Sequence, residues 1–420
     1  MYKLLALIAI AALLVFAAGC SEDECATCPP DDGSTAPTQA YVGSATCGNA
    51  ACHEDKYNTF IESGHPYKLT AVPGDAGPTY PFDDEHTSGS IVSRDGPAPE
   101  GTAPWTDYAY VIGGYGWKAR FVKPDGNIYT ATDKAQLNLW GDNEWVEYHL
   151  GEDKPYNYSC FKCHTTGASE EGSWPDGTTG FGTFAFGGVQ CEECHGQGAQ
   201  HSSDPKRFAM IVDANSTLCG RCHTRDAQNR VEVSVPSPPD PAKKYIRHHE
   251  QYDEMVHSPH AAVGCNACHN PHASTVYDAV TADDGIIADC TDAGCHEDKA
   301  NPANTAHNGA PDCVDCHMPE AAKSARFDPD NPYVADIRSH TFMINPSELD
   351  KSAMWTSDGK FMAQDEFGRG RITLDFACFS CHKDDPTNPT NPGAQYGYKL
   401  PADLINMATG MHATGGMASK

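Results

Sequence analysis

Positively charged residues are scarce in this chain of 420 residues. Lys and Arg number 29 against 57 Asp and Glu, which gives a formal net charge of −28 at pH 7. A surface with this excess of negative charge repels other polyanions, so we expect neither nucleic acid nor an anionic lipid surface among its ligands. Attraction of a cationic partner is one interpretation of the acidity, and a simply solvated surface is the other.

Long hydrophobic runs are also missing. The most apolar run, residues 4–16, is too short for a membrane-spanning helix. Lys3 precedes this run, and the small residues Ala17-Ala18-Gly19 follow it. A positive charge, a short apolar run and small residues in this order predict a signal peptide over residues 1–19, so the protein is expected to be exported.

Cys20 directly follows the predicted signal peptide. Small residues ending in a cysteine resemble the lipobox of bacterial lipoproteins, and Ser21 resembles the type sent to the outer membrane. We therefore expect an outer-membrane lipoprotein on the periplasmic or cell-surface face, with an ordinary secretory signal as the alternative. Residues 20–39 are acidic and rich in Pro, Ser, Thr and Gly, which predicts a flexible tether. Within it, Cys25 and Cys28 lack a following histidine and predict a small exposed disulfide.

Cysteine and histidine, by contrast, are abundant, with 19 and 20 copies. Eight times a pair of cysteines is followed immediately by a histidine. Six of these groups have C-x-x-C-H spacing, for which the composition predicts roughly 0.04 chance matches; the other two have four residues between the cysteines. The groups are Cys47/Cys52/His53, Cys160/Cys163/His164, Cys191/Cys194/His195, Cys219/Cys222/His223, Cys265/Cys268/His269, Cys290/Cys295/His296, Cys313/Cys316/His317 and Cys378/Cys381/His382.

This triplet is the attachment site of a c-type haem. The two thiols form thioether bonds to the porphyrin edge, and the adjacent imidazole becomes the proximal iron ligand. Zinc sites and disulfides give no reason for a histidine after every second cysteine. The two long-spacer groups share a His-Glu-Asp-Lys sequence, at His53 and His296, which supports both as real sites. We therefore expect eight covalently bound c-type haems.

The haems should also shape the fold. Apolar residues make up only 39% of the chain, so the macrocycles must supply much of the core, and the apo-protein should fold poorly. We predict a mostly α and irregular, haem-packed multihaem cytochrome c with small β-hairpin elements. The octahaem domain is expected over residues 40–382, with a β-containing insertion at about 67–155, and a C-terminal tail over 383–420.

Aromatic and β-branched residues mark the β-containing insertion. They are concentrated in residues 108–122, and the turn sequence of 123–127 follows, which together predict a hairpin. We expect this hairpin to cover the core without chemistry of its own. Shorter strand pieces are expected around 333–337 and 371–375.

The second ligand of each iron decides what the haems can do. Iron with two protein ligands carries electrons, whereas an open position permits chemistry. Twelve histidines remain after the eight proximal ones, enough for every iron: His65, His86, His149, His201, His248, His249, His257, His260, His272, His307, His340 and His412. Sequence context favours eight of them as distal ligands, His65, His149, His201, His249, His260, His272, His307 and His340. Of these, His201 and His272 lie too close to the preceding motif to reach its iron, so they are assigned to neighbouring haems.

Several segments resemble known multihaem cytochromes c, in particular the hydroxylamine-oxidoreductase-related tetrahaem and octahaem proteins. They are Tyr41-Val-Gly-Ser, Cys160-Phe-Lys-Cys-His-Thr-Thr-Gly167, Cys191-Glu-Glu-Cys-His-Gly-Gln-Gly-Ala-Gln-His201, Cys265-Asn-Ala-Cys-His-Asn-Pro-His272 and Cys313-Val-Asp-Cys-His-Met-Pro319. The resemblance covers roughly residues 40–382. It implies haems stacked in parallel and perpendicular pairs, with distal histidines donated across pairs. Electron carriers and enzymes share these motifs.

Departures from the enzymes of this group help to separate the alternatives. Octahaem nitrite reductases use a C-x-x-C-K site, whereas every motif here ends in histidine. Hydroxylamine oxidoreductase uses a cross-linked tyrosine, and nothing marks one among the 18 tyrosines. Octahaem tetrathionate reductases place a lysine on the catalytic iron, which leaves Lys68 and Lys118 open as candidates.

We therefore predict an electron-transfer protein with no assigned catalytic residue, acting in respiratory or extracellular electron transfer. Its expected partners are redox proteins or extracellular electron acceptors, together with a membrane through the lipid on Cys20. One alternative is an octahaem oxidoreductase acting on nitrite, hydroxylamine or tetrathionate at one open haem. Another is a self-associating cytochrome that forms filaments or serves as a docking subunit.

Overall fold

The computed structural model describes residues 40–82, 104–139, 143–225, 230–234, 243–277, 285–299, 311–348, 350–382 and 401–412. The predicted signal peptide, Cys20, the tether with Cys25 and Cys28, and the histidines His86 and His307 lie outside these residues. None of the helices in the described ranges is long and apolar enough to cross a membrane.

The helices are short, and several coincide with haem motifs. A C-x-x-C spacing places both cysteines on one face of a single helical turn, which suits attachment to one porphyrin edge. Side chains cap three of these turns, because Asn157, Asn215 and Asp312 accept hydrogen bonds at the helix N-termini. The helices are α1 (Ser44–Cys47), α2 (Glu54–Ile61), α4 (Tyr158–Phe161), α5 (Cys191–His195), α6 (Ala199–Ser203), α7 (Ser216–Gly220), α8 (Gln251–Val256), α10 (Cys313–His317), α11 (Leu374–His382) and α13 (Pro401–Gly410).

Five short 3₁₀ turns complete the helical elements. They are η1 (Pro66–Lys68), η2 (Trp105–Asp107), η4 (Cys265–Ala267), η5 (Glu297–Lys299) and η7 (Lys351–Met354). Three of them adjoin haem-site residues, because η1 directly follows His65, η4 begins with Cys265 and η5 directly follows His296.

A five-stranded antiparallel sheet is the largest regular element. Its strands run in sequence order, β1 (Leu69–Ala71), β2 (Tyr110–Gly113), β3 (Lys118–Val122), β4 (Gln136–Asn138) and β5 (Glu144–Val146). The predicted strand segment 108–122 is two strands, β2 and β3, which pair as a hairpin with Val111 opposite Phe121. Its turn is at 114–117, and the predicted turn at 123–127 is a second reversal that returns Ile128 to Val122. Because the sheet has five strands, the fold is mixed rather than mostly α.

Smaller sheets organise the rest of the chain. Strands β8 (Val233–Ser234), β9 (Tyr245–Arg247) and β10 (Ala322–Lys323) form one sheet, β11 (Ile344–Asn345) pairs with β12 (Ile372–Thr373), and β6 (Thr165–Thr166) pairs with β7 (Phe186–Gly187). The predicted strand around 371–375 therefore exists as β12. The segment 333–337 contributes only a bridge from Ile337 to Ala322.

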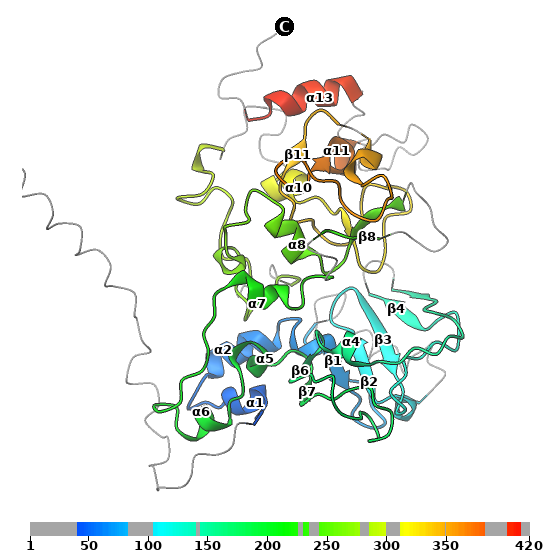
Figure 1. The fold of residues 1–420 in the computed structure, drawn as a ribbon, viewed down its shortest axis with the longest axis vertical. Helices are drawn as coiled ribbons and strands as arrows, with labels where there is room; N and C mark the ends of the chain where they lie inside the picture. Colours follow the sequence, from blue (N-terminus) through cyan, green and yellow to red (C-terminus); the bar gives the residue numbers. More distant parts are fainter. Residues whose placement is uncertain are drawn as a thin grey trace, which may run out of the picture.

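Two apolar clusters hold the two ends of the molecule. An aromatic cluster that includes Tyr80, Trp105 and Phe121 packs against the five-stranded sheet. A second cluster, including Tyr245 and Phe376, surrounds β9 and α11. Figure 1 shows the sheet, with α5 beside it, near one end of the long axis and α11 and α13 near the other, with α7, α8 and α10 following one another between them. The motif-bearing segments therefore run along the molecule.

Candidate haem-binding site

A single large cavity connects most of the motif-bearing segments. Its volume is about 3280 Å³, and it is lined by the cysteines and histidines of the first six motifs. An ordinary small-molecule pocket has about 300–1,000 Å³, so this cavity has room for several large groups. Val212, Val263 and Ile286 line it, and they are among the most exposed large hydrophobic side chains. Attachment sulfurs, imidazoles and uncovered apolar side chains are what packed porphyrins require, so these residues fit c-type haem.

The spacing of histidine rings tests this fit directly. Two imidazoles on one iron, with bonds of about 2.0 Å, have ring centres about 6 Å apart. We number the sites 1 to 8 in the order of their motifs. Six proximal histidines face a second histidine at 5.7–6.5 Å. The pairs are His53–His201 (site 1), His195–His272 (site 3), His223–His65 (site 4), His269–His340 (site 5), His296–His260 (site 6) and His317–His412 (site 7).

Backbone carbonyls orient several of these rings. Nδ1 of His195, His201 and His317 hydrogen-bonds to the carbonyl oxygen of Ile211, Phe208 and Phe342, at 2.6, 2.7 and 2.8 Å. An Nδ1–H that donates to a carbonyl leaves Nε2 deprotonated and free for the metal. The sequence-level assignment of His201 to another haem than its own agrees with this geometry, since His201 faces His53 rather than His195.

Burial keeps the deeper imidazoles neutral, the form that binds iron. Desolvation, with a further contribution from the charge of Lys68, lowers the pKa of His65 and of His164 to about 3. Desolvation likewise lowers the pKa of His340 to about 4. These side chains are therefore ready to serve as ligands at any physiological pH.

Two buried carboxylates hold the segments that supply ligands. Glu192 of α5 accepts hydrogen bonds from the backbone N–H groups of Val42, Gly43 and Gly198, at 2.7–3.0 Å. It thus ties the segment before site 1 to the loop that leads to His201. Glu254 of α8 accepts from Ser339 Oγ and from the backbone N–H of His340, at 2.5 and 2.6 Å. It thus fixes the backbone that carries the distal ligand of site 5.

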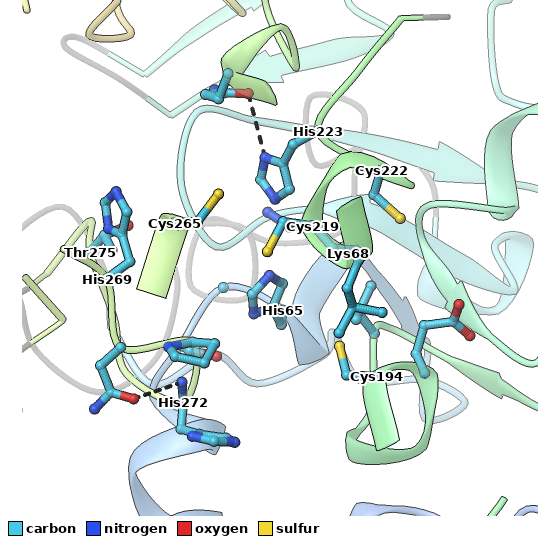
Figure 2. A pocket seen from close by; sticks show the side chains of 18 of the residues that line it. His65, Lys68, Cys194, Cys219, Cys222, His223, Cys265, His269, His272 and Thr275 are labelled. Carbon is cyan, nitrogen blue, oxygen red and sulfur yellow. Dashed lines mark hydrogen bonds between the residues drawn. The ribbon is translucent and has the colours of Figure 1, made fainter. Parts of the chain in front are cut away.

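Site 2 differs from the six paired sites. His164 is buried and packs 6.2 Å from the ring of Tyr156, and among the described residues no histidine ring faces it at ligand spacing. The ring centre of His249 lies 6.5 Å from that of His223, and the charge of His164 contributes to the lowered pKa of His249. His249 therefore lies between sites 4 and 2. Figure 2 shows His65 and His223 turned toward one another, with Lys68 beside them.

Four buried cations surround site 2. The charges of Lys68, Arg120, Lys118 and Arg225 all act on His164. Lys118 and Arg120 lie two residues apart on β3 and share a face, whereas Ala119 and Phe121 between and after them are fully buried in the aromatic cluster. The hairpin predicted only to cover the core therefore also lines the haem cavity. The alternation Lys-Ala-Arg-Phe is the sequence signal for this arrangement.

Polar but mostly neutral groups hold these cations. Lys118 Nζ donates to the carbonyl of Ser324 at 2.8 Å, and Arg120 Nε donates to Gln136 Oε1 at 2.7 Å. Arg225 donates to Nε2 and the carbonyl of His248, which makes His248 an acceptor. Within the described ranges, no carboxylate forms an ion pair with any of the four. The charge of Asp336 acts on Lys118, and the charges of Glu250 and Glu232 act on Arg225, so carboxylates offset part of this positive charge and an anion beside the four cations would offset more.

Three histidines differ from the sequence-based assignment of distal ligands or are not covered by the six pairs: His149 and His307, which were predicted as ligands, and His412, which was not. His149 forms an ion pair with Glu152 at 2.7 Å, and among the described residues no proximal histidine faces it. His307 lies outside the described residues. His412, which the sequence reasoning left in the tail, faces His317. Its signal in the sequence was a lone histidine after an apolar stretch, which had no motif nearby to mark it.

The attachment cysteines show which sites are neighbours. Side chains of Cys47 and Cys191, Cys163 and Cys222, Cys219 and Cys265, and Cys290 and Cys313 are in hydrogen-bonding contact. Cys194 and Cys219, Cys268 and Cys295, and Cys316 and Cys378 are close enough for their charges to interact. These contacts place the sites in the order 1-3-4-5-6-7-8, with site 2 attached to site 4.

Site 8 departs from the equivalence that the sequence suggests for all eight motifs. Its residues Cys378, Cys381 and His382 do not line the large cavity, and neither do the motif residues of site 7. The physical reason is that the first half of α11 is buried in the second apolar cluster, which draws the motif into that end of the molecule.

The side chain of Cys381 is half-buried at the end of α11. Its Sγ accepts a hydrogen bond from the neighbouring Ser380 Oγ at 3.8 Å, and its charge acts on Cys378 and on Cys316 of site 7. The structure therefore brings Cys381 to the attachment cysteines of site 7 but not to the shared cavity. Haem attachment at Cys381 stays a prediction that rests on the motif.

Comparisons with known proteins agree with this site. The family model of cytochrome c554 and c-prime matches residues 130–196, which contain the motifs of sites 2 and 3. No curated protein sequence matches the chain. Given also the repeated attachment motifs and facing imidazoles, the protein is a multihaem c-type cytochrome, a class whose haems transfer electrons.

Three solved cytochrome structures align with this chain. Octahaem sulfite reductase MccA of Wolinella succinogenes aligns with a TM-score of 0.51 at 17% identity, over 82% of this chain and 65% of that one. The outer cell wall cytochrome OcwA gives 0.45 at 19%, over 84% and 86%. The undecahaem cytochrome from the S-layer of Carboxydothermus ferrireducens gives 0.40 at 18%, over 69% and 52%, so this chain spans about half of its length. At these identities the likeness to MccA shows a shared fold alone.

Proposed function

We propose that this protein is an octahaem electron-transfer cytochrome. The observation that carries the proposal is the continuous order of attachment cysteines along the molecule. When bound, the haems supply one-electron chemistry. The chain's contribution is to hold neighbouring porphyrin edges close together through adjoining sulfurs, in the sequence 1-3-4-5-6-7-8.

The facing imidazoles support a closed, electron-carrying state at most of these sites. Two protein ligands leave no position for a substrate, and they change little between oxidation states, so electrons can enter and leave without rearrangement. Carbonyl acceptors at Ile211, Phe208 and Phe342 keep the rings in place at sites 3, 1 and 7.

Protein-film voltammetry of the purified holoprotein tests this proposal. With no substrate present, we expect a reversible signal whose integrated charge corresponds to eight electrons per molecule, because every site lies next to another site. A charge well below eight electrons on a protein whose mass includes eight haems would mean that some sites are isolated, and would contradict the proposed order.

The cellular setting is also a proposal, and it rests on the N-terminal sequence. A lipid on Cys20 would anchor the cytochrome to an outer membrane, where redox proteins or extracellular acceptors could receive its electrons. We expect the Cys20→Ala variant to leave the membrane fraction or to stay unprocessed. Normal processing with unchanged membrane retention would exclude the lipoprotein assignment.

A second function, reduction or oxidation of a small anion at site 2, is favoured by the four buried cations. Lys68, Lys118, Arg120 and Arg225 would attract and orient an oxyanion of nitrogen or sulfur near the iron of His164. Site 2 is joined to the electron-carrying order through the contact of Cys163 with Cys222.

Electron paramagnetic resonance separates the two functions. If site 2 is open, the oxidised protein has one high-spin ferric signal, and nitrite or sulfite changes it. The Lys118→Met variant should then bind these anions more weakly, whereas Lys123→Met, at an exposed lysine paired with Asp125, should not. Purely low-spin spectra that no anion changes would exclude the second function and leave the electron carrier.

A further inference from the structure

His412 stands apart from the other distal histidines because of where it comes from in the chain. It follows α13, the most C-terminal helix among the described residues, and its Nε2 lies 3.5 Å from Nε2 of His317. The two ring centres are 5.7 Å apart and nearly parallel, with 28° between the planes. Two nitrogens on one iron stand about 4 Å apart, so a small outward shift accommodates the metal.

The hydrogen bonding of His317 leaves the nitrogen that faces His412 free to bind iron. Its Nδ1 is hydrogen-bonded to the carbonyl of Phe342 at 2.8 Å, so Nε2, the atom that faces His412, is the one available to iron. The proximal ring is therefore fixed by the protein, and the approach of the distal ring depends on the C-terminal segment alone.

His412 lies on an exposed segment at the end of α13. Helix α13 packs on α11, and Leu404 is 3% exposed there, while His412 itself is exposed. Figure 1 shows α13 lying over α11 at the end of the molecule. His340 at site 5, by comparison, is buried and has its backbone N–H bonded to Glu254. Among the six facing distal histidines only His412 is exposed, and a side chain in contact with water leaves its partner at lower free-energy cost than a covered one, so His412 is the least firmly held of the six.

We propose that His412 is a releasable sixth ligand of the site 7 haem, and that docking of α13 on α11 controls whether this iron is closed. This inference rests on the proposed electron-transfer function, because it concerns the coordination of one haem in that chain. Small molecules that bind haem iron, such as carbon monoxide on the ferrous form, would compete with His412. Because they bind only when His412 has left the iron, their apparent affinity equals the intrinsic affinity multiplied by the fraction of molecules in which His412 is released.

The location gives release a consequence for electron flow. Cys316 of site 7 lies beside Cys378 of site 8, and α11 carries the site 8 motif as well as the contact with α13. Loss of an imidazole changes the axial ligation that sets the haem potential. Undocking of α13 would therefore alter the step between the last two sites without affecting the order of sites 1 to 6.

Three full-length holoprotein variants test the proposal. His412→Ala removes the ligand, Leu404→Asp undocks α13 but keeps the ligand, and Met411→Ala, the neighbouring residue, is the control. Intact mass first verifies that haem attachment is unchanged. Carbon monoxide binding to the reduced protein and electron paramagnetic resonance of the oxidised protein are then measured for each variant and for the wild type.

We expect carbon monoxide to bind one haem of His412→Ala at least tenfold faster than it binds that haem in the wild type, where His412 must first leave, and one low-spin signal to become high-spin. Leu404→Asp should show the same fast binding phase, and Met411→Ala should match the wild type. Unchanged binding kinetics and spectra in His412→Ala would overturn the ligand assignment. An open iron in His412→Ala together with wild-type behaviour of Leu404→Asp would overturn control by α13. High-spin signals at several sites of the wild type would instead contradict the proposed electron-transfer function, whatever the variants do.

Discussion

At the scale of single residues, the histidines of this protein are distinguished by what their second nitrogen does. Nδ1 of His195 donates to the carbonyl of Ile211, so Nε2 is left for iron, and the ring of His272 is stacked opposite at 6.1 Å with 4° between planes. Nδ1 of His149 pairs with Glu152, which also leaves Nε2 free, but among the described residues no proximal histidine ring faces His149. What separates the two histidines is therefore the ring opposite Nε2 and not the hydrogen bond of Nδ1.

Replacement of His272 by Met tests this distinction. We expect the haem at site 3 to stay attached through Cys191 and Cys194, and its potential to rise, because a methionine ligand favours the reduced iron and axial ligands span as much as ~0.8 V in haem proteins. Potentiometric titration followed by optical spectra measures the shift. The His149→Met variant tests the sequence-based prediction for His149 in the same way: a shifted potential at a site other than site 3 would show that His149 binds iron, and unchanged potentials would show that it does not.

At the scale of elements, short helices and loops are held by buried carboxylates rather than by long regular structure. Glu254 of α8 is 2% exposed and accepts hydrogen bonds from the 339–341 loop. Burial raises the pKa of Glu254 to about 7. Since α8 itself is only six residues long, this link connects it to the distal ligand of site 5.

Substitution at Glu254 should therefore disturb one haem selectively. In Glu254→Ala, the donors of Ser339 and His340 lose their acceptor, at a cost of about 1–3 kcal/mol for each buried group. We expect broadened or partly high-spin signals from site 5 and a lower free energy of unfolding. Glu254→Gln keeps an acceptor oxygen and should resemble the wild type. Spectra of Glu254→Ala identical to those of the wild type would mean that the loop holds His340 without this carboxylate.

At the scale of the whole molecule, the haems replace a conventional core. Apolar clusters occupy the two ends, and a cavity of about 3280 Å³ runs between them. A cavity of this size would collapse without contents, because its apolar lining would be left in water. We therefore expect the chain to close into this fold only when the haems are attached.

Haem stoichiometry is the corresponding prediction. Intact mass should exceed the mass of the mature polypeptide by eight haems, because the long-spacer sites have the same ring geometry as the others, His53–His201 at 6.3 Å and His296–His260 at 5.9 Å. Six haems would mean that the long-spacer sites stay empty, and seven, with Cys378 and Cys381 unmodified in a peptide digest, would mean that site 8 does. The polypeptide made without haem attachment should be rapidly digested by protease, and resistance equal to that of the holoprotein would contradict the haem-filled core.

The sequence alone determined the chemistry of attachment. Each Cys/Cys/His group is local, spanning five or seven residues, so its meaning does not depend on distant parts of the chain. The strand character of 108–122 and the turn at 123–127 were also readable, because alternation and turn residues act over short distances, whereas the turn that divides β2 from β3 was not predicted. The same local motif could not show that Cys381 lies away from the shared cavity, because packing of α11 into the second apolar cluster decides its surroundings.

Only the tertiary structure decided which imidazoles face one another, since His65 meets His223 and His317 meets His412 across long stretches of chain. Likewise, the four cations around His164 come from positions that carry no common motif. Folding alone gathers the charges of Lys68, Lys118, Arg120 and Arg225 there, because residues far apart in sequence become neighbours only when the chain closes around the haems.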